Sequence, residues 1–223
     1  EDNNKSDEVT VAKAGEYKRL SKPVIVGEQG NKVRYENGRP APGTTGVWDI
    51  NSAMRMRVRL WTAMFNEIAF VFWNTSYAKD GHKMNMWIGP KERQYAAALQ
   101  CFSYGLDKDV KMAKVELSDP AAVRGYALVS KKAAGVYLHH FKEHGSEMKD
   151  LKVTLDVPAA GKAYWYRPED SVVVASVVAQ AGKQTLTVPP FAIDLALLVT
   201  AGGCPDIDRD GKEKTPVMIH RAI

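Results

Sequence analysis

The chain has 223 residues, of which 45% are hydrophobic and 26% charged, a composition typical of a globular protein with a buried core. It contains no run of about 18 apolar residues that would predict a membrane-spanning helix, and its net charge of +5 is dispersed among acidic residues. We therefore expect neither a membrane nor a nucleic acid as partner, and the two cysteines are too few for a disulfide framework.

The first structured stretch follows a polar and charged start, residues 1–14, which predicts either a flexible entry segment or the end of a longer element. Residues 22–28 (KPVIVGE) form a short apolar run entered through a proline, which is typical of a buried strand in a parallel sheet. This strand places the carboxylate of Glu28 at its carboxyl end, where catalytic side chains lie in α/β barrels. An ion-paired or capping glutamate is the alternative interpretation.

A long loop comes next, residues 29–45, which is rich in turn residues and includes Tyr35. Loops of this length directly after a strand are usually functional. Residues 49–64 predict a helix, and residues 67–74 predict a second apolar strand. The order of strand, loop, helix and strand predicts a parallel crossover unit.

The helix predicted over residues 49–64 has one apolar face and a cluster of basic residues. We expect the apolar face to pack on a sheet and the basic cluster to form a solvated surface. The apolar face consists of Met54, Val58, Trp61 and Phe65, and the basic cluster of Arg55, Arg57 and Arg59.

A second loop, residues 77–88, contains Trp87 and leads into a helix predicted over residues 90–106. From about residue 110 the apolar period changes from helical to two. About eight short strands separated by turns predict an antiparallel β-sandwich. They lie near residues 110–117, 123–130, 134–141, 151–157, 163–167, 172–179, 184–188 and 192–199.

Residues 140–144 (HFKEH) match the H-x-x-E-H spacing, in which two histidines one helical turn apart hold zinc. That arrangement requires a helix. Here His140 lies at the end of the strand predicted near residues 134–141 and His144 precedes a turn, so we expect surface residues of a hairpin.

The end of the chain contains Asp206, Asp208 and Asp210 followed by Gly211, which have the spacing of a calcium loop. The bidentate acid of such loops is missing, since Val217 occupies the twelfth position. A calcium site that takes ligands from elsewhere and an acidic turn without metal are both compatible with this pattern. We expect no cofactor.

Trp73 ends the second predicted parallel strand, beside Asn74. The crossover unit brings its ring to the same rim of the sheet as Glu28. A flat apolar ring is suited to stack on a sugar, and a carboxylate is suited to attack an anomeric carbon. The pair favours carbohydrate chemistry over a core tryptophan.

Residues 22–30 (KPVIVGEQG) resemble the seventh strand of retaining (β/α)₈-barrel glycoside hydrolases of the cellulase and mannanase type. Residues 70–74 (FVFWN) resemble the eighth strand, and residues 163–170 (AYWYRPED) and 189–196 (PPFAIDLA) resemble parts of the small β-sandwich appended to many of these enzymes. The resemblance implies that Glu28 is the nucleophile and that Trp73 forms the floor of the sugar subsite. Residues that line the cleft would be Tyr35, Asn74, Tyr77 and Trp87.

The resemblance also implies three regions: residues 1–108 as the carboxyl-terminal portion of a barrel, 109–200 as a β-sandwich and 201–223 as a polar tail. A full barrel needs eight βα units, and this chain carries only the last two. The acid/base glutamate of the family has no counterpart here. We therefore expect a carbohydrate substrate, an amino-terminal barrel segment supplied by the same or another chain, no activity without it, and a secreted or periplasmic location.

The alternative is a non-catalytic carbohydrate-binding or structural protein in which the sandwich carries the function. Exposed coplanar aromatic rings on the sandwich would favour this alternative, whereas buried rings would indicate a brace for the barrel. The rings in question belong to Tyr137, Tyr164, Trp165 and Tyr166.

Overall fold

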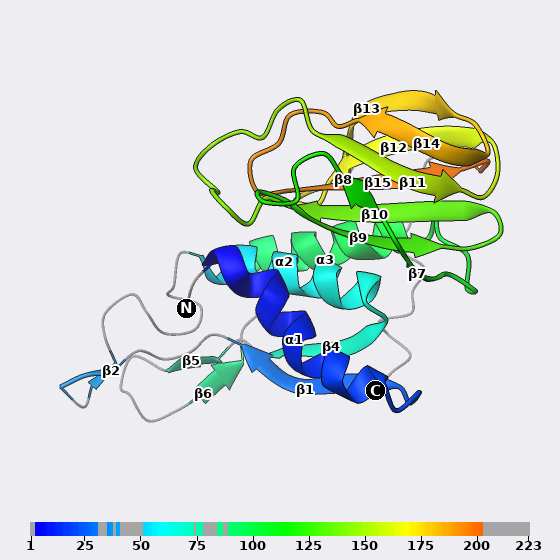
Figure 1. Cartoon of the computed structure of the whole chain (residues 1–223). Helices are drawn as coiled ribbons and strands as arrows, with labels where there is room; N and C mark the ends of the chain where they lie inside the picture. The colour runs from blue at the N-terminus through cyan, green and yellow to red at the C-terminus, as the bar shows by residue number, and fades with distance from the viewer. Residues whose placement is uncertain are drawn as a thin grey trace.

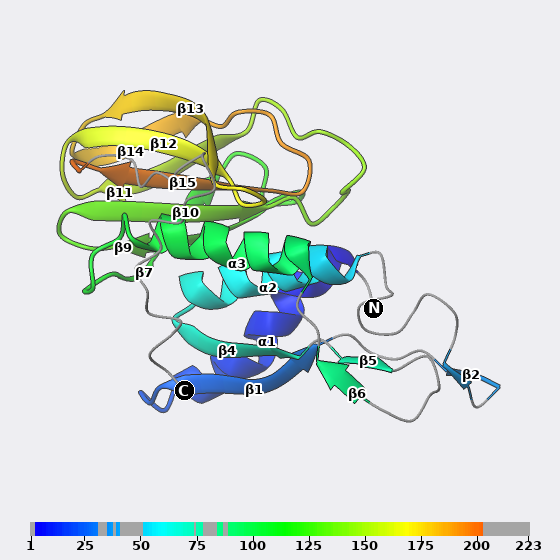
Figure 2. The same ribbon diagram turned by 180° about the vertical axis from the view of Figure 1, so that it is seen from behind.

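The computed structural model describes residues 3–30, 35–37, 39–40, 51–73, 75–77, 84–86 and 89–202. Its elements form layers, with a pair of parallel strands below, helices in the middle and two antiparallel sheets above, and the amino-terminal helix runs along one side down to the parallel strands (Figure 1). The view from behind shows the same order of layers (Figure 2). Within the described part, no helix is long and apolar enough to cross a membrane.

The lowest layer consists of β1 (Val24–Gly30) and β4 (Ile68–Trp73), which pair in parallel. Helix α2 (Ser52–Phe65) lies between them in the chain. This confirms the predicted order of strand, helix and parallel strand. The helix begins three residues later than predicted, at Ser52 after Asn51.

Residues 1–14 do not match the prediction of a flexible segment, because α1 (Ser6–Lys18) occupies most of them. This helix lacks a clear apolar stripe, and its first turns bury the polar side chains of Ser6, Asp7 and Thr10. Further along, Ala14 packs with α2 and with β1. The helix is held by polar contacts to the rest of the fold, which a reading of hydrophobic periodicity does not detect.

Residues 111–200 form nine strands, one more than predicted, because the first predicted strand divides between two sheets. All neighbouring pairs are antiparallel. The six-stranded sheet, in the order β13-β12-β15-β10-β9-β7, contains β7 (Lys111–Ala113), β9 (Arg124–Val129), β10 (Ala133–His139), β12 (Gly161–Arg167), β13 (Val172–Ala179) and β15 (Asp194–Thr200). The three-stranded sheet contains β8 (Glu116–Leu117), β11 (Lys152–Val157) and β14 (Gly182–Thr187).

The two sheets enclose one apolar core that includes Leu138, Val153, Trp165 and Leu197. In β11 the buried residues alternate with more exposed ones, as the sequence predicts for a strand with one covered face. Strand β10 is buried along its whole length. Both of its faces must therefore be covered, one by the three-stranded sheet and the other by the helices.

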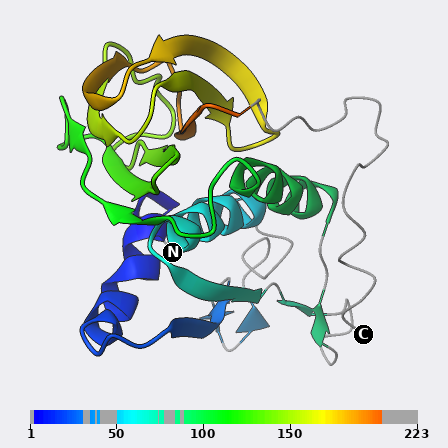
Figure 3. The ribbon, with the colours of Figure 1, turned by 90° about the vertical axis from the view of Figure 1, so that its right-hand side faces the viewer.

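The helices cover the second face of the six-stranded sheet (Figure 3). Trp61 and Phe65 of α2 and Phe102 of α3 (Pro90–Ser103) pack on Tyr137 of β10 and Tyr166 of β12. The ring of Trp61 stacks on Tyr137 with their centroids 5.6 Å apart. The apolar surface between helices and sandwich is continuous, so the boundary predicted near residue 108 crosses a shared core.

The arginines of α2 do not form the expected solvated surface, because Arg55, Arg57 and Arg59 are all buried. On its other side the helix packs Ala63 against β1 and β4. Helix α2 is thus enclosed between the parallel strands and the sandwich, and most of its side chains are inaccessible to solvent whatever their polarity.

Candidate functional site

The carboxyl ends of β1 and β4 contain the residues that the sequence assigns to chemistry. Val26 pairs with Phe70 and Gln29 with Phe72, so two residues of β1, Gly27 and Glu28, lie opposite one residue of β4. This β-bulge lies in the carboxyl-terminal half of β1, and Glu28 is one of its two residues. Bulges redirect side chains and are frequent beside active sites.

Trp73 is the last residue of β4 and pairs with Gly30, two residues beyond Glu28 on the neighbouring strand. The backbone therefore brings Glu28 and Trp73 to the same end of adjacent parallel strands. Tyr77 is the last residue of the short strand β5 (Thr75–Tyr77), which follows β4 in the chain. Strand β5 pairs with β6 (Met84–Met86). These short strands lie at the same end of the molecule as the tips of β1 and β4 (Figure 1).

Tyr35 begins the two-residue strand β2 (Tyr35–Glu36), which pairs with β3 (Arg39–Pro40). Asn74 and Trp87 lie outside the described residues, as do Asp206, Asp208 and Asp210 of the predicted calcium loop. Among the residues that the structure describes, no three His, Cys, Asp or Glu side chains are grouped to hold a metal.

The H-x-x-E-H residues are not on a helix, as predicted, but the expectation that His140 lies on the surface is wrong. Its ring is buried, and its Nδ1 lies 2.9 Å from the carbonyl oxygen of Ala192. The Nε2 atom of His144 lies 2.9 Å from Nε2 of His139. The histidines thus attach the segment after β10 to the sandwich.

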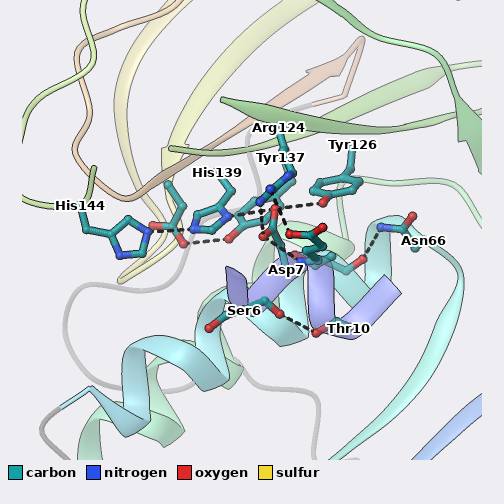
Figure 4. A network of polar contacts seen from close by, with 12 residues as sticks. Ser6, Asp7, Thr10, Asn66, Arg124, Tyr126, Tyr137, His139 and His144 are labelled. Carbon is teal, nitrogen blue, oxygen red and sulfur yellow. Dashed lines mark hydrogen bonds and ion pairs between the residues drawn. The ribbon is translucent and has the colours of Figure 1, made fainter. Parts of the chain in front are cut away.

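A buried polar network joins the start of α1 to the sandwich (Figure 4). The carboxylate of Asp7 accepts hydrogen bonds of 2.9 Å from Arg124 and from the hydroxyl of Tyr126. Nδ1 of His139 lies 3.0 Å from Oδ2 of Asp7. The two atoms are close enough for an ion pair, but they do not have the geometry of a hydrogen bond. Sequence reasoning missed Asp7 and His139, because neither residue belongs to a recognisable motif.

Electrostatics in this network favour a charged Asp7 and a neutral His144. Burial alone would raise the pKa of Asp7, but contacts with His139, Arg124 and Tyr126 lower it overall. Burial, and then the neighbouring His139, lower the pKa of His144 to about 4. Burial also raises the pKa of Tyr126, which therefore remains a hydrogen-bond donor to Asp7. The network serves structure, since it fixes α1 to the sheet.

A second buried pair joins α2 to β15. Nε and Nη2 of Arg57 lie 3.0 Å from the two carboxylate oxygens of Asp194, a bidentate geometry. The Tyr137 hydroxyl donates to Asp194 over 3.1 Å, and the guanidinium of Arg57 lies 4.8 Å from the centre of the Tyr95 ring. Burial opposes the charge of Arg57, but Asp194 outweighs it and raises the pKa of Arg57 overall.

The aromatic rings that would favour a carbohydrate-binding sandwich are mostly inaccessible. Tyr137, Trp165 and Tyr166 are buried, and Tyr164 is partly buried beside the interface with the helices. No flat row of exposed rings is formed by these four residues.

No protein-family model and no curated protein matches this chain. Among solved structures, it is similar to a glycoside hydrolase with 14% sequence identity and a TM-score of 0.53 over 80% of this chain and 42% of that chain. It is also similar to a GH30 endoxylanase from Clostridium papyrosolvens C71, with 12% identity and a TM-score of 0.48 over 83% and 44% of the two chains. A glycoside hydrolase family 5 protein from Bacteroides vulgatus ATCC 8482 matches with 15% identity and a TM-score of 0.49 over 90% and 46%.

These comparisons concern the fold. The chain spans less than half the length of each of the three structures, and its sequence identity to them is low. The match with a TM-score of 0.53 includes the greater part of this chain. The chain therefore has a glycoside hydrolase-like fold, with mixed α/β content and mostly antiparallel sheets.

Proposed function

We propose that this chain forms the carboxyl-terminal part of a glycoside hydrolase, which cleaves glycosidic bonds of a polysaccharide or oligosaccharide with retention of anomeric configuration. Glu28 is the nucleophile and Trp73 the stacking platform of the sugar subsite. Tyr35, Asn74, Tyr77 and Trp87 contribute to the cleft. The observation that carries the proposal is the parallel pair β1–β4, with Glu28 in a bulge and Trp73 at the same strand end.

The mechanism needs two steps. The carboxylate of Glu28 attacks the anomeric carbon, and a carboxylic acid outside this chain protonates the leaving oxygen. Water, deprotonated by that second group, then attacks the glycosyl-enzyme and releases Glu28. Two inversions give net retention. Retaining enzymes hold their two carboxyl groups about 5 Å apart, so this chain supplies one half of the pair and is inactive alone.

The exposed face of the β1–β4 pair supports the presence of further barrel strands. Val24 and Ile68 are covered by the helices, but Ile25 is 69% and Val71 47% exposed on the opposite face. Parallel strands are normally covered on both faces. A further barrel segment, in the same or another chain, would cover this face and pair with both edges.

The proposal assigns residues 1–108 to the barrel and 109–200 to a brace, with 201–223 as a tail. Buried side chains of the sandwich pack against α2 and α3, which supports a bracing role over an independent binding role. A secreted or periplasmic location belongs to the same proposal, because polysaccharides are external substrates.

Activity of the complete polypeptide tests the assignment. Glu28→Gln removes the nucleophile while keeping the size of the side chain, and we expect turnover to fall by more than about a thousandfold without loss of folding. Glu16→Gln, at an exposed position of α1, is the matched control and should retain full activity. A Glu28→Gln variant with wild-type turnover would refute the assignment.

A further inference from the structure

The surface between α2 and the sandwich contains a pocket of about 230 Å³. It is lined by Arg57 of α2, by the turn that joins β12 to β13, and by the segment that precedes β15. Pockets that enclose drug-sized ligands measure roughly 300–1,000 Å³. This pocket therefore admits one small ring and its substituents.

The walls of the pocket are fixed before any ligand enters. The segment before β15 is held by His140, whose backbone N–H donates to Ile193 over 2.9 Å and whose ring contacts the carbonyl of Ala192. The turn between β12 and β13 is held by the ion pair of Arg167 with Asp170. A preformed site loses little conformational entropy on binding.

The guanidinium of Arg57 and the carboxylate of Glu169 both line the pocket, and they are far enough apart for a ligand hydroxyl to bind to both. Nη1 of Arg57 lies 3.9 Å from Oε2 of Glu169, too far for a hydrogen bond. The other carboxylate oxygen of Glu169, Oε1, accepts a long hydrogen bond of 3.5 Å from the hydroxyl of Tyr95. A ligand hydroxyl between these groups can donate to Glu169 and accept from Arg57, so that each contact is charge-assisted.

Charge and polarity restrict the class of ligand. The formal charges of Arg57 and Arg167 cancel those of Glu169 and Asp194, so the lining favours neither an anion nor a cation. Val174, Pro190 and Ile193 supply the aliphatic part of the lining. A neutral ring with hydroxyls on one edge and C–H groups on one face matches both the polar and the aliphatic residues of the lining.

We propose that this pocket binds one sugar unit of the polysaccharide, with one hydroxyl that donates to Glu169 and accepts from Arg57 and with the C–H face of the ring on Pro190 and Ile193. The identity of the ligand rests on the carbohydrate function proposed above. The segment that leads into β15 lies at the same end of the molecule as the tips of β1 and β4 (Figures 1 and 2).

The test uses the complete polypeptide with Glu28→Gln, which cannot cleave, and follows methyl NMR signals during titration with cellohexaose, xylohexaose and mannohexaose. We expect one of these sugars to shift the methyl signals of Val174 and Ile193. Glu169→Gln should weaken that binding about tenfold, because it removes the charge from the hydrogen bonds. Ala192→Leu should weaken it too, by filling the pocket from an exposed position.

Glu147→Gln is the control, since Glu147 pairs with Lys149 on the surface and does not line the pocket. Calorimetry on Trp73→Ala distinguishes the two proposals. Binding that depends on Trp73 without shifts of Val174 or Ile193 refutes the pocket and leaves the proposed function standing. Shifts that Glu169→Gln and Ala192→Leu abolish, and Trp73→Ala does not, support the pocket by itself. No binding of any of the three sugars contradicts the pocket.

Discussion

Arg57 and Asp194 form a bidentate ion pair buried between α2 and β15, with two N–O distances of 3.0 Å. The two residues are 137 positions apart in the sequence. They connect the helix that follows Glu28 in the chain to the central part of the sandwich. The position of α2 therefore depends on the sandwich, through this pair and the aromatic contacts beside it.

Asp194→Asn tests the pair. The substitution leaves the charge of Arg57 buried without its counter-charge and weakens the acceptor of the Tyr137 hydroxyl. We expect the free energy of unfolding to fall by about 3 kcal/mol, as measured by urea denaturation of this chain. Glu116→Gln breaks the exposed ion pair with Lys183 and should change stability by less than about 0.5 kcal/mol. Equal effects of the two substitutions would contradict the account.

Stability should fall as the pH is lowered below neutral, and His144 contributes to the fall. Burial, then His139, lower its pKa to about 4 in the folded state, against 6.5 for an exposed histidine. Between these values the unfolded chain binds the extra proton, so the free energy of unfolding decreases as the pH falls from 6.5 to 4. We expect His144→Gln to reduce this loss by about 1–2 kcal/mol after allowance for solvent screening.

Asp7 adds a second loss below that range. Its folded-state pKa lies below 3.8, because contacts with His139, Arg124 and Tyr126 outweigh the effect of burial. The stability that it contributes is present above pH 3.8 and disappears as the pH falls through the lower folded value. Thermal unfolding of the wild type and of His144→Gln across pH 3–8 measures the pH-dependent loss of stability. Lys131→Gln, at an exposed position, is the control. A His144→Gln curve parallel to the wild type would exclude the assigned role of His144.

Two glycines should respond in opposite directions to alanine. A Cβ atom at Gly161 would lie 2.5 Å from the backbone oxygen of Thr200, in the ladder between β12 and β15. Gly161→Ala should therefore destabilise the fold by about 1–3 kcal/mol. At Gly15, inside α1, the added methyl meets no atom within 4 Å, and alanine should stabilise by about 0.5–1 kcal/mol. Urea denaturation gives both values, and a neutral Gly161→Ala would contradict the tight packing there.

The sandwich should not fold independently at the predicted boundary. A fragment of residues 109–202 would expose the apolar side chains that α2 and α3 cover, including Leu128, Tyr166 and Leu198. We expect it to bind a hydrophobic dye, to aggregate and to lose cooperative unfolding, whereas residues 3–202 should unfold cooperatively. A monomeric fragment with a sharp unfolding transition would show that the helices are dispensable.

Hydrophobic periodicity predicted much of this fold. The apolar runs at β1 and β4, the helical spacing of Val58, Trp61 and Phe65, and the alternation in β11 each appear in the structure at nearly the predicted positions. Each of these signals comes from apolar residues that repeat with the period of the element that buries them.

The elements that sequence reasoning missed are those whose buried side chains are polar. Helix α1 is attached through Asp7, and the arginines of α2 lie in the interior although their composition indicates a surface. Their partners lie far along the chain: Asp7 contacts Arg124 and His139, and Arg57 contacts Asp194. A pattern read within a window of some 15 residues contains no information about such contacts. The bulge at Glu28 was also unpredictable, because it depends on the register between β1 and β4.

The measurement that tests the central claim most directly is covalent trapping of the nucleophile. The complete polypeptide is incubated with activated 2-deoxy-2-fluoro glycosides of glucose, xylose and mannose, which form the glycosyl-enzyme and release it slowly, and the digested protein is analysed by mass spectrometry. The account predicts that the peptide containing Glu28 gains the mass of one fluorosugar, and that Glu28→Gln prevents labelling while Glu16→Gln does not. A fluorosugar attached to any other carboxylate would contradict it.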